Sequence, residues 1–231
     1  MTGQLSFDLP VRRALGREDF FVAPANALAL ALIDTWPDWP GRKLALSGPA
    51  GSGKTHLAHV WAERADARIV AARDLAASDI PALAAGSVAV EDVPQVAGDP
   101  AGEQALFHLH NLVLAEGHSL LLTGIAPPRR WGLRLPDLAS RVEGAHGAVL
   151  EPPDDALLFA VIAKLFADRQ VDPAADVIPY LVRRIERSFD AARRAVDALD
   201  ARALSEGRAV TRPLAARTLD ALERQTRNTY D

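Results

Sequence analysis

The sequence predicts an α/β fold, in which a core with a central parallel β-sheet flanked by helices is followed by a small all-α lid subdomain. Three observations predict it. Short apolar runs alternate with helical stretches, which is typical of a parallel sheet. A glycine-rich loop at residues 48–53 follows the first of these runs. Beyond Pro152-Pro153 the pattern is helical throughout.

Composition narrows the class of protein. Of the 231 residues, 49% are hydrophobic and only 6% aromatic, which favours helices and short aliphatic strands over a β-sandwich. The net charge of −4 argues against broad binding to a nucleic-acid backbone and favours a protein partner. The absence of cysteine excludes disulfides and suits a reducing cytoplasm. We expect no membrane partner, because neither a signal peptide nor a run of roughly 20 apolar residues is present.

The expected elements follow in order along the chain. A helix begins at Pro24 and ends near the pairs Trp36-Pro37 and Trp39-Pro40, because proline disfavours helix in the preceding residue. A strand then begins at Lys43. The expected strands contain the apolar runs 44–46, 69–71, 88–90, 120–122 and 148–150, and the later helices are expected near 55–64, 104–116, 155–169, 174–186, 188–205 and 212–223.

These elements group into three parts. Residues 1–23 are expected to form an N-terminal tail and linker, since their few apolar residues cannot build a core. Residues 24–153 are expected to form the α/β core and residues 154–231 the helical lid. The change in composition at the proline pair marks this boundary.

One segment carries a phosphate-binding motif. Gly48-Pro49-Ala50-Gly51-Ser52-Gly53-Lys54-Thr55 fits G-x-x-x-x-G-K-[ST], and it lies between an expected strand and an expected helix, as the motif requires. The glycines let backbone N–H groups converge on phosphate oxygens at a helix N-terminus. Lys54 then reaches the β- and γ-phosphates, and Thr55 binds Mg²⁺. The alternative is an ordinary glycine-rich turn.

An acidic pair follows the expected strand at 88–90. Glu91 and Asp92 stand where a Walker B strand presents carboxylates to Mg²⁺ and to an attacking water. We interpret Glu91 as a second Mg²⁺ ligand and the pair as catalytic. The alternative is an acidic strand end at the surface.

Several segments together resemble the DnaA-related AAA+ family, from residue 4 to about 222. The resemblance implies an AAA+ P-loop core that binds ADP or ATP with Mg²⁺. The segment that opens the family's core near the adenine is matched by Phe20-Phe21-Val22 with Asn26, and the exit of its phosphate loop by Gly53-Lys54-Thr55-His56-Leu57. Its sensor-1 strand is matched by Leu121-Leu122-Thr123-Gly124. The box that carries its arginine finger is matched by Leu135-Pro136-Asp137-Leu138-Ala139-Ser140-Arg141.

The N-terminal segment is similar to the family's motif for binding the sliding clamp. In that motif Gln4 lies at the edge of a pocket that the apolar side chains Leu5, Phe7 and Leu9 fill. A segment that folds on binding gains its affinity from a few such buried anchors. The alternative is a tail without a partner.

The resemblance makes Arg141 an arginine finger supplied in trans. It follows an apparent helix that starts after Pro136, and its guanidinium would neutralise charge on a nucleotide held by a neighbouring subunit. The alternative is a surface arginine that pairs with Asp137 or Glu143.

Three positions depart from the family's pattern. The Walker B carboxylates read Glu91-Asp92, so the shorter side chain stands at the position that usually polarises water. Ile125 stands where the sensor-1 strand commonly continues into aspartate, and Asp190 stands where the lid helix carries the sensor-2 arginine. Arg193 or Arg194 would have to supply that charge from the next turn. These changes predict weak or no intrinsic hydrolysis, with ADP the expected occupant acting as a structural or switching ligand.

The resemblance therefore implies a regulatory role like that of the family's short members, which inactivate DnaA. The tail would bind the clamp, and Arg141 would promote hydrolysis of ATP on DnaA. DNA would be contacted only through the clamp, and a homodimer is compatible with the sequence. We also expect the chain to end after the lid, without an origin-binding domain. Two alternatives stay open, namely a self-sufficient AAA+ ATPase and a clamp-tethered binding module without a catalytic arginine.

Overall fold

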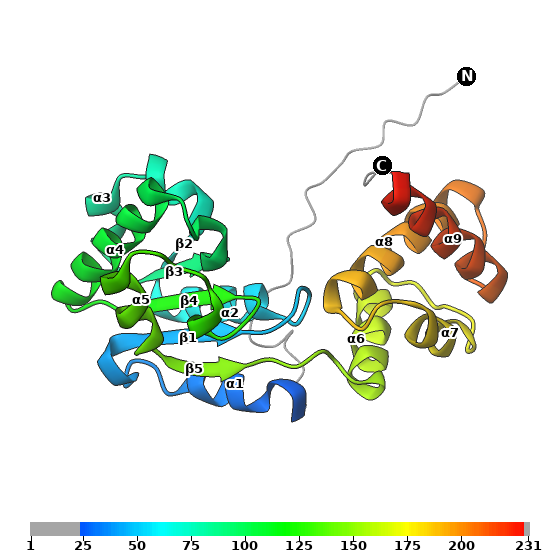
Figure 1. The fold of residues 1–231 in the computed structure, drawn as a ribbon. Coiled ribbons are helices and arrows are strands. Elements are labelled where there is room, and N and C mark those ends of the chain that lie inside the picture. The colour runs from blue at the N-terminus through cyan, green and yellow to red at the C-terminus, as the bar shows by residue number, and fades with distance from the viewer. Residues whose placement is uncertain (1–23, 229–231) are drawn as a thin grey trace, which may run out of the picture.

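The computed structural model describes residues 24–228 of the chain, and its side chains from Asn26 to Arg224. Its core is a parallel sheet of five strands in the order β2-β3-β4-β1-β5, with helices on both faces (Figure 1). The strands are β1 (Lys43–Ser47), β2 (Arg68–Ala71), β3 (Val88–Glu91), β4 (Leu120–Gly124) and β5 (His146–Val149). The predicted fold class is confirmed.

Helices cover the sheet, and a helical part follows it. The core helices are α1 (Pro24–Asp34), α2 (Lys54–Ala65), α3 (Ile80–Ala84), α4 (Pro100–Ala115) and α5 (Pro136–Glu143), with short 3-10 turns η2 (Pro40–Arg42), η3 (Ala72–Ala77), η4 (Val93–Val96) and η5 (Pro128–Arg130). The C-terminal helices are α6 (Asp155–Asp168), α7 (Val177–Arg184), α8 (Phe189–Glu206) and α9 (Arg212–Asn228).

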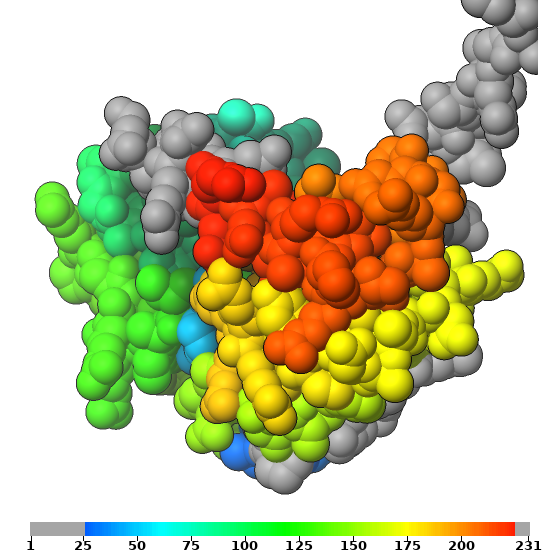
Figure 2. Space-filling view, turned by 90° about the vertical axis from the view of Figure 1, so that its right-hand side faces the viewer, coloured from blue at the N-terminus to red at the C-terminus, as the bar shows by residue number. Residues whose placement is uncertain are grey.

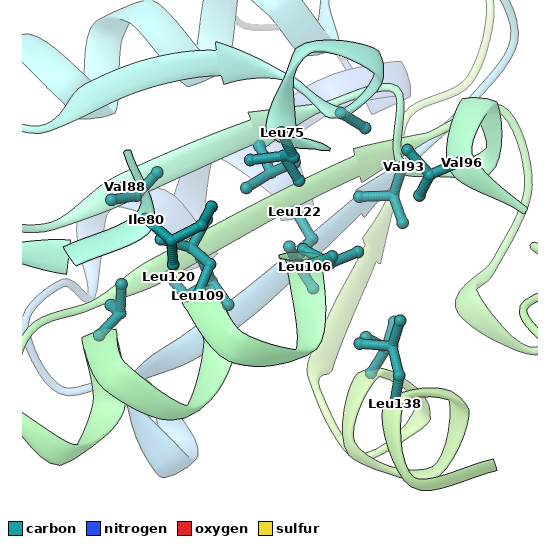
Figure 3. Close-up of a cluster of buried hydrophobic side chains, with 14 of the residues drawn as sticks. Leu75, Ile80, Val88, Val93, Val96, Leu106, Leu109, Leu120, Leu122 and Leu138 are labelled. Atoms are coloured by element: carbon teal, nitrogen blue, oxygen red, sulfur yellow. The ribbon is translucent and has the colours of Figure 1, made fainter. Parts of the chain in front are cut away.

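Alternate residues of the strands feed two different cores. Leu120 and Leu122 of β4 pack with α3, α4 and α5 on one face of the sheet, where Figure 3 shows Leu120 beside Leu109 and Leu122 beside Leu106. Leu121, between them, packs with α1 and α2 on the other face. This follows from the two-residue repeat of a strand, and it explains why buried parallel strands read as continuous apolar runs.

A third cluster of buried side chains lies within the C-terminal helices. It draws on residues from Leu158 onward and contains apolar residues of α6, α7, α8 and α9. Figure 2 shows these helices packed together on the side of the molecule that faces the viewer.

The structure confirms the strands and longer helices expected from the sequence and adds short elements that were not expected. The helix α4 begins at Pro100 rather than at Gln104. Asp99 caps it by accepting hydrogen bonds from the backbone N–H groups of Ala101 and Gly102, so an aspartate before a proline was the missed start signal. Within residues 24–228, no helix is long and apolar enough to cross a membrane.

Candidate nucleotide-binding site

The phosphate loop joins β1 to α2 at the carboxyl edge of the sheet, where open α/β sheets bind their ligands. Gly51 and Gly53 have φ angles of 70° and 98°, which glycine adopts without strain. No side chain caps the first turn of α2, so its leading N–H groups have no intrahelical partner. The loop therefore presents backbone N–H donors at a helix N-terminus, as a phosphate site requires.

Lys54 is held inside this loop with only 7% of its surface exposed. Its Nζ donates hydrogen bonds to the carbonyl oxygens of Gly48 at 2.7 Å and Pro49 at 2.8 Å. An ammonium group has three donors, so one remains for a phosphate oxygen. Burial lowers the pKa of Lys54, while the nearby carboxylates of Asp92, Asp190 and Glu91 act in the opposite direction.

The acidic pair lies beside the loop at the end of β3. Asp92 has a φ of 54°, which is unusual for a residue other than glycine and is often found at functional sites. Its backbone N–H donates to the hydroxyl of Thr123 at 3.0 Å, and Thr123 is buried in β4. The structure thus brings Glu91, Asp92, Thr123 and Lys54 to one edge of the sheet.

Two buried oxygen atoms fit a bound nucleotide and Mg²⁺. Ser52 Oγ and Glu91 Oε1 have no hydrogen-bond partner in the part of the chain that the structure describes, although buried polar atoms are normally paired. Thr55, in the first turn of α2, is exposed. Residues 24–228 contain no group of three or more histidine, aspartate or glutamate side chains that could hold a metal ion.

The first turn of α8 packs directly on the phosphate loop, a contact that the sequence did not reveal. The backbone N–H of Phe189 donates to the carbonyl of Gly51 at 2.9 Å. A Cβ built on Gly51 would lie 2.4 Å from the Cβ of Ser188, and one built on Gly53 would lie 3.2 Å from the Phe189 ring. The absence of side chains at Gly51 and Gly53 therefore lets the first turn of α8 approach the phosphate loop closely.

A Gly51→Ala variant tests this contact. We expect weaker nucleotide binding and a loss of about 1–3 kcal/mol in unfolding free energy, because alanine is strained at this φ and overlaps Ser188. The control is Gly117→Ala, where φ is 86° but nothing lies within 4 Å of the added Cβ. Denaturant titration and nucleotide titration of both variants measure the difference, and equal effects would show that the lid contact is unimportant.

The positions that depart from the family's pattern lie around the same edge. Asp190, in the first turn of α8, is close enough for its charge to act on Lys54, whereas Arg193 and Arg194 are not among the charges that shift the pKa of that lysine. Ile125 follows β4 and is 63% exposed. Among the charged residues of α8 that the structure describes, the one whose charge acts on Lys54 is therefore the carboxylate of Asp190.

Arg141 lies at the opposite edge of the sheet. The sequence led us to expect Arg141 after the helix α5, but the structure places it within the last turn of that helix. The Nζ of Lys43, the first residue of β1, donates to its backbone carbonyl at 2.6 Å. The phosphate loop begins after the last residue of β1, and the five residues of this strand separate the loop from Lys43 by about 15 Å. Arg141 is therefore exposed at a distance from its own chain's phosphate loop.

The side chain of Arg141 rests on α4. Its Cζ lies 5.5 Å from the ring centroid of Phe107, within the range of a cation–π interaction. His110, one turn further along α4, is buried beside it. Burial lowers the pKa of His110 to about 4, and the charges of Lys43 and Arg141 add to this, so the histidine is neutral at neutral pH.

The remaining expected site residues are His56 and a group near the N-terminus. His56 is half-buried in the first turn of α2. The expected adenine contacts Phe21 and Val22 lie outside the described residues, as does the expected clamp-binding segment with Gln4, Leu5, Phe7 and Leu9.

The protein shares its fold with solved AAA+ structures. It is similar to domain III of the replication initiation protein DnaA from Thermotoga maritima, with a TM-score of 0.77 and 19% identity over 92% of this chain and 98% of that chain. AMPPCP-bound DnaA from Aquifex aeolicus matches with a TM-score of 0.66 and 20% identity over 80% and 64% of the two chains. A RuvB variant from Thermotoga maritima matches with a TM-score of 0.65 and 15% identity over 89% and 71%. No protein-family model matches the chain.

The parallel sheet, the phosphate loop and the helical C-terminal part together define an AAA+ fold with a P-loop site. Within that class, the likeness to DnaA domain III extends over nearly the whole of both chains. At these identities the likeness is one of fold.

Proposed function

We propose that this chain is a regulatory inactivator of the replication initiator DnaA, of the Hda type. Its tail binds the DNA polymerase sliding clamp, its own site binds ADP or ATP, and Arg141 completes the ATPase site of DnaA. Hydrolysis then leaves DnaA in its ADP form and prevents a second initiation. The activity belongs to the complex rather than to the chain alone.

The observation that carries this proposal is the separation of Arg141 from the phosphate loop. The two lie at opposite edges of one sheet, and this separation supports a role for Arg141 at a nucleotide held by another chain. An arginine that enters a site in trans stabilises the charge that builds during γ-phosphate transfer. The fold likeness to DnaA domain III supports a DnaA subunit as the partner.

The nucleotide bound by the chain itself acts as a structural or switching ligand, with ADP the expected occupant. Asp190 adds a carboxylate to those of Glu91 and Asp92 near Lys54, which disfavours the further negative charge of a γ-phosphate. Exposed Ile125 offers no polar group to that phosphate. Rapid hydrolysis by the isolated protein that Lys54→Ala abolishes would contradict this part of the proposal.

The clamp contact is proposed for Gln4, Leu5, Phe7 and Leu9. It rests on the similarity of this segment to the family's motif, with Leu5 and Phe7 as the apolar anchors. Mg²⁺ is proposed to bind with Thr55 and Glu91 as protein ligands.

The experiment measures hydrolysis of ATP bound to DnaA in the presence of clamp loaded on DNA. The wild-type chain is expected to accelerate hydrolysis, and the acceleration is expected to disappear when the clamp is omitted or when Leu5 and Phe7 are both replaced by alanine. If the wild type has no effect, the chain is a binding module or an ATPase with another partner, and the proposed function is wrong.

A further inference from the structure

A buried carboxylate joins two loops at one end of α4. Glu103 is only 3% exposed, and its side chain accepts hydrogen bonds from the backbone N–H groups of Gly98 at 2.7 Å, Arg134 at 2.9 Å and Leu135 at 2.6 Å. Three backbone donors on one carboxylate are enough to keep it ionised in a buried position. The interaction fixes both loops relative to α4.

These loops lead to the two functional regions of the chain. Gly98 follows η4, the turn after the acidic pair at the end of β3. Leu135 is the N-cap residue of α5, and its own side chain makes no capping hydrogen bond. Glu103 therefore supplies, from a neighbouring helix, the anchor at the start of α5, the helix whose last turn contains Arg141.

The same face of α4 also contacts the far end of α5. Phe107 lies four residues after Glu103, so the two side chains stand one above the other on the helix surface. Phe107 supports the guanidinium of Arg141, and Lys43 binds the backbone carbonyl of the same residue. Both ends of α5 are thus fixed, the first by Glu103 and the last by Phe107 and Lys43.

We propose that Glu103 is a positioning residue that holds α5 in the place from which Arg141 reaches a nucleotide on a partner chain. This inference rests on the proposed function for its catalytic meaning. Glu103 itself contacts neither nucleotide nor partner, and it acts through the N–H groups at the start of α5.

The negative charge of Glu103 is what the arrangement requires. Burial alone raises the pKa of this carboxyl, but the hydrogen bonds from Arg134, Gly98 and Leu135, with the charge of Arg134, outweigh burial and lower it. Glu103→Gln preserves the shape but directs an amide that also carries donors towards three N–H groups. We therefore expect the start of α5 to detach from α4.

The first readout is nuclear magnetic resonance of the full chain with bound ADP. In the wild type, the amide signals of Arg134 and Leu135 are expected to titrate together, with a midpoint below the usual glutamate range, and Overhauser contacts are expected between Phe107 and Arg141. Glu103→Gln is expected to abolish the titration and weaken those contacts. The control is Glu116→Gln, because Glu116 is exposed at the other end of α4.

The second readout is the stimulated hydrolysis of ATP on DnaA. A small misplacement of a catalytic group costs up to about 100-fold, so we expect Glu103→Gln to lower the maximal rate about 10- to 100-fold. The concentration for half-maximal stimulation, and the affinity for ADP, are expected to stay unchanged. Glu103→Asp keeps the charge on a shorter side chain and is expected to restore part of the rate.

The outcomes separate this inference from the proposed function. If Glu103→Gln keeps the contacts between Phe107 and Arg141 and stimulates fully, the positioning role is wrong. If the wild type does not stimulate DnaA but Glu103→Gln still loses those contacts, the positioning role stands and the proposed function fails. If Glu103→Gln does not fold, Glu103→Asp serves the same comparison: weakened contacts between Phe107 and Arg141 with partly reduced stimulation support the positioning role, and wild-type contacts with full stimulation overturn it.

Discussion

Replacing Lys54 with alanine is expected to reduce the affinity for ADP and ATP about 10- to 100-fold. The ammonium group is preoriented by the carbonyls of Gly48 and Pro49, so its remaining donor forms a charge-assisted hydrogen bond with phosphate. Such a bond contributes about 1.5–3 kcal/mol, which corresponds to that loss in affinity. Equilibrium titration with a fluorescent ADP analogue measures it.

The comparison requires a lysine that does not line the site. Lys164 lies in α6 and pairs with Asp168 at 3.1 Å, and Lys164→Ala is expected to bind nucleotide as the wild type does. Since the Lys54 charge is also surrounded by three carboxylates, its removal leaves a net negative site. Undiminished binding by Lys54→Ala would mean that the loop does not bind the phosphates.

Replacing Arg141 with alanine is expected to reduce the stimulated hydrolysis of ATP on DnaA by at least about 10³-fold, the range observed for arginine fingers. The contact with Phe107 contributes only about 0.5–1 kcal/mol at an exposed site, so the fold and ADP binding are expected to survive. Single-turnover hydrolysis on DnaA, with a matched thermal unfolding curve, gives both quantities.

Two further variants show whether the guanidinium itself is needed. Arg141→Lys keeps the charge but loses the planar, multi-donor group, and we expect it to restore little activity. Arg130 is exposed in η5, and Arg130→Ala is expected to stimulate normally. If Arg141→Ala and Arg130→Ala lose activity equally, general positive charge on this face is responsible rather than a finger.

Most of the fold could be predicted because its signals are local. The apolar runs at 44–46 and 120–122 and the proline pairs mark the strands and helix ends within a few residues of where the structure has them. The start of α4 was missed by four residues because the helical pattern was followed only from Gln104, although Asp99-Pro100 is a start signal. The short turns η3 and η4 have no repeating pattern to detect.

The candidate site could be predicted only where its residues are adjacent in sequence. Lys54, Thr55 and the acidic pair stand in motifs, whereas the contact of Phe189 with Gly51 joins segments that only the folded chain brings together. Glu103 was missed for the same reason, because its three donors come from two distant loops. A glutamate in the first turn of a helix reads as a favourable charge at the helix N-terminus, and nothing in the sequence indicates that it is buried.

The structure shows what one departure from the family's pattern does to the charge near Lys54. An ungapped reading of the sequence placed Asp190 at the sensor-2 position, and the structure puts its charge within reach of Lys54. The sequence could not decide whether Arg193 or Arg194 replaces the missing arginine, because that depends on the rotation of α8 about its axis.

The most direct measurement of the central claim is a crosslink from α5, the helix that carries Arg141, to the nucleotide site of the partner. Because the chain has no cysteine, Ser140→Cys places a single thiol next to Arg141 on the exposed side of α5 while Arg141 is kept. Ser205→Cys, exposed near the end of α8, is the control. Each variant is labelled with a photoreactive maleimide and mixed with ATP-bound DnaA and loaded clamp.

The Ser140→Cys variant is predicted to crosslink to peptides around the phosphate loop of DnaA, and the Ser205→Cys variant is predicted not to do so. Equal crosslinking by the two variants, or none by the Ser140→Cys variant, would contradict the account.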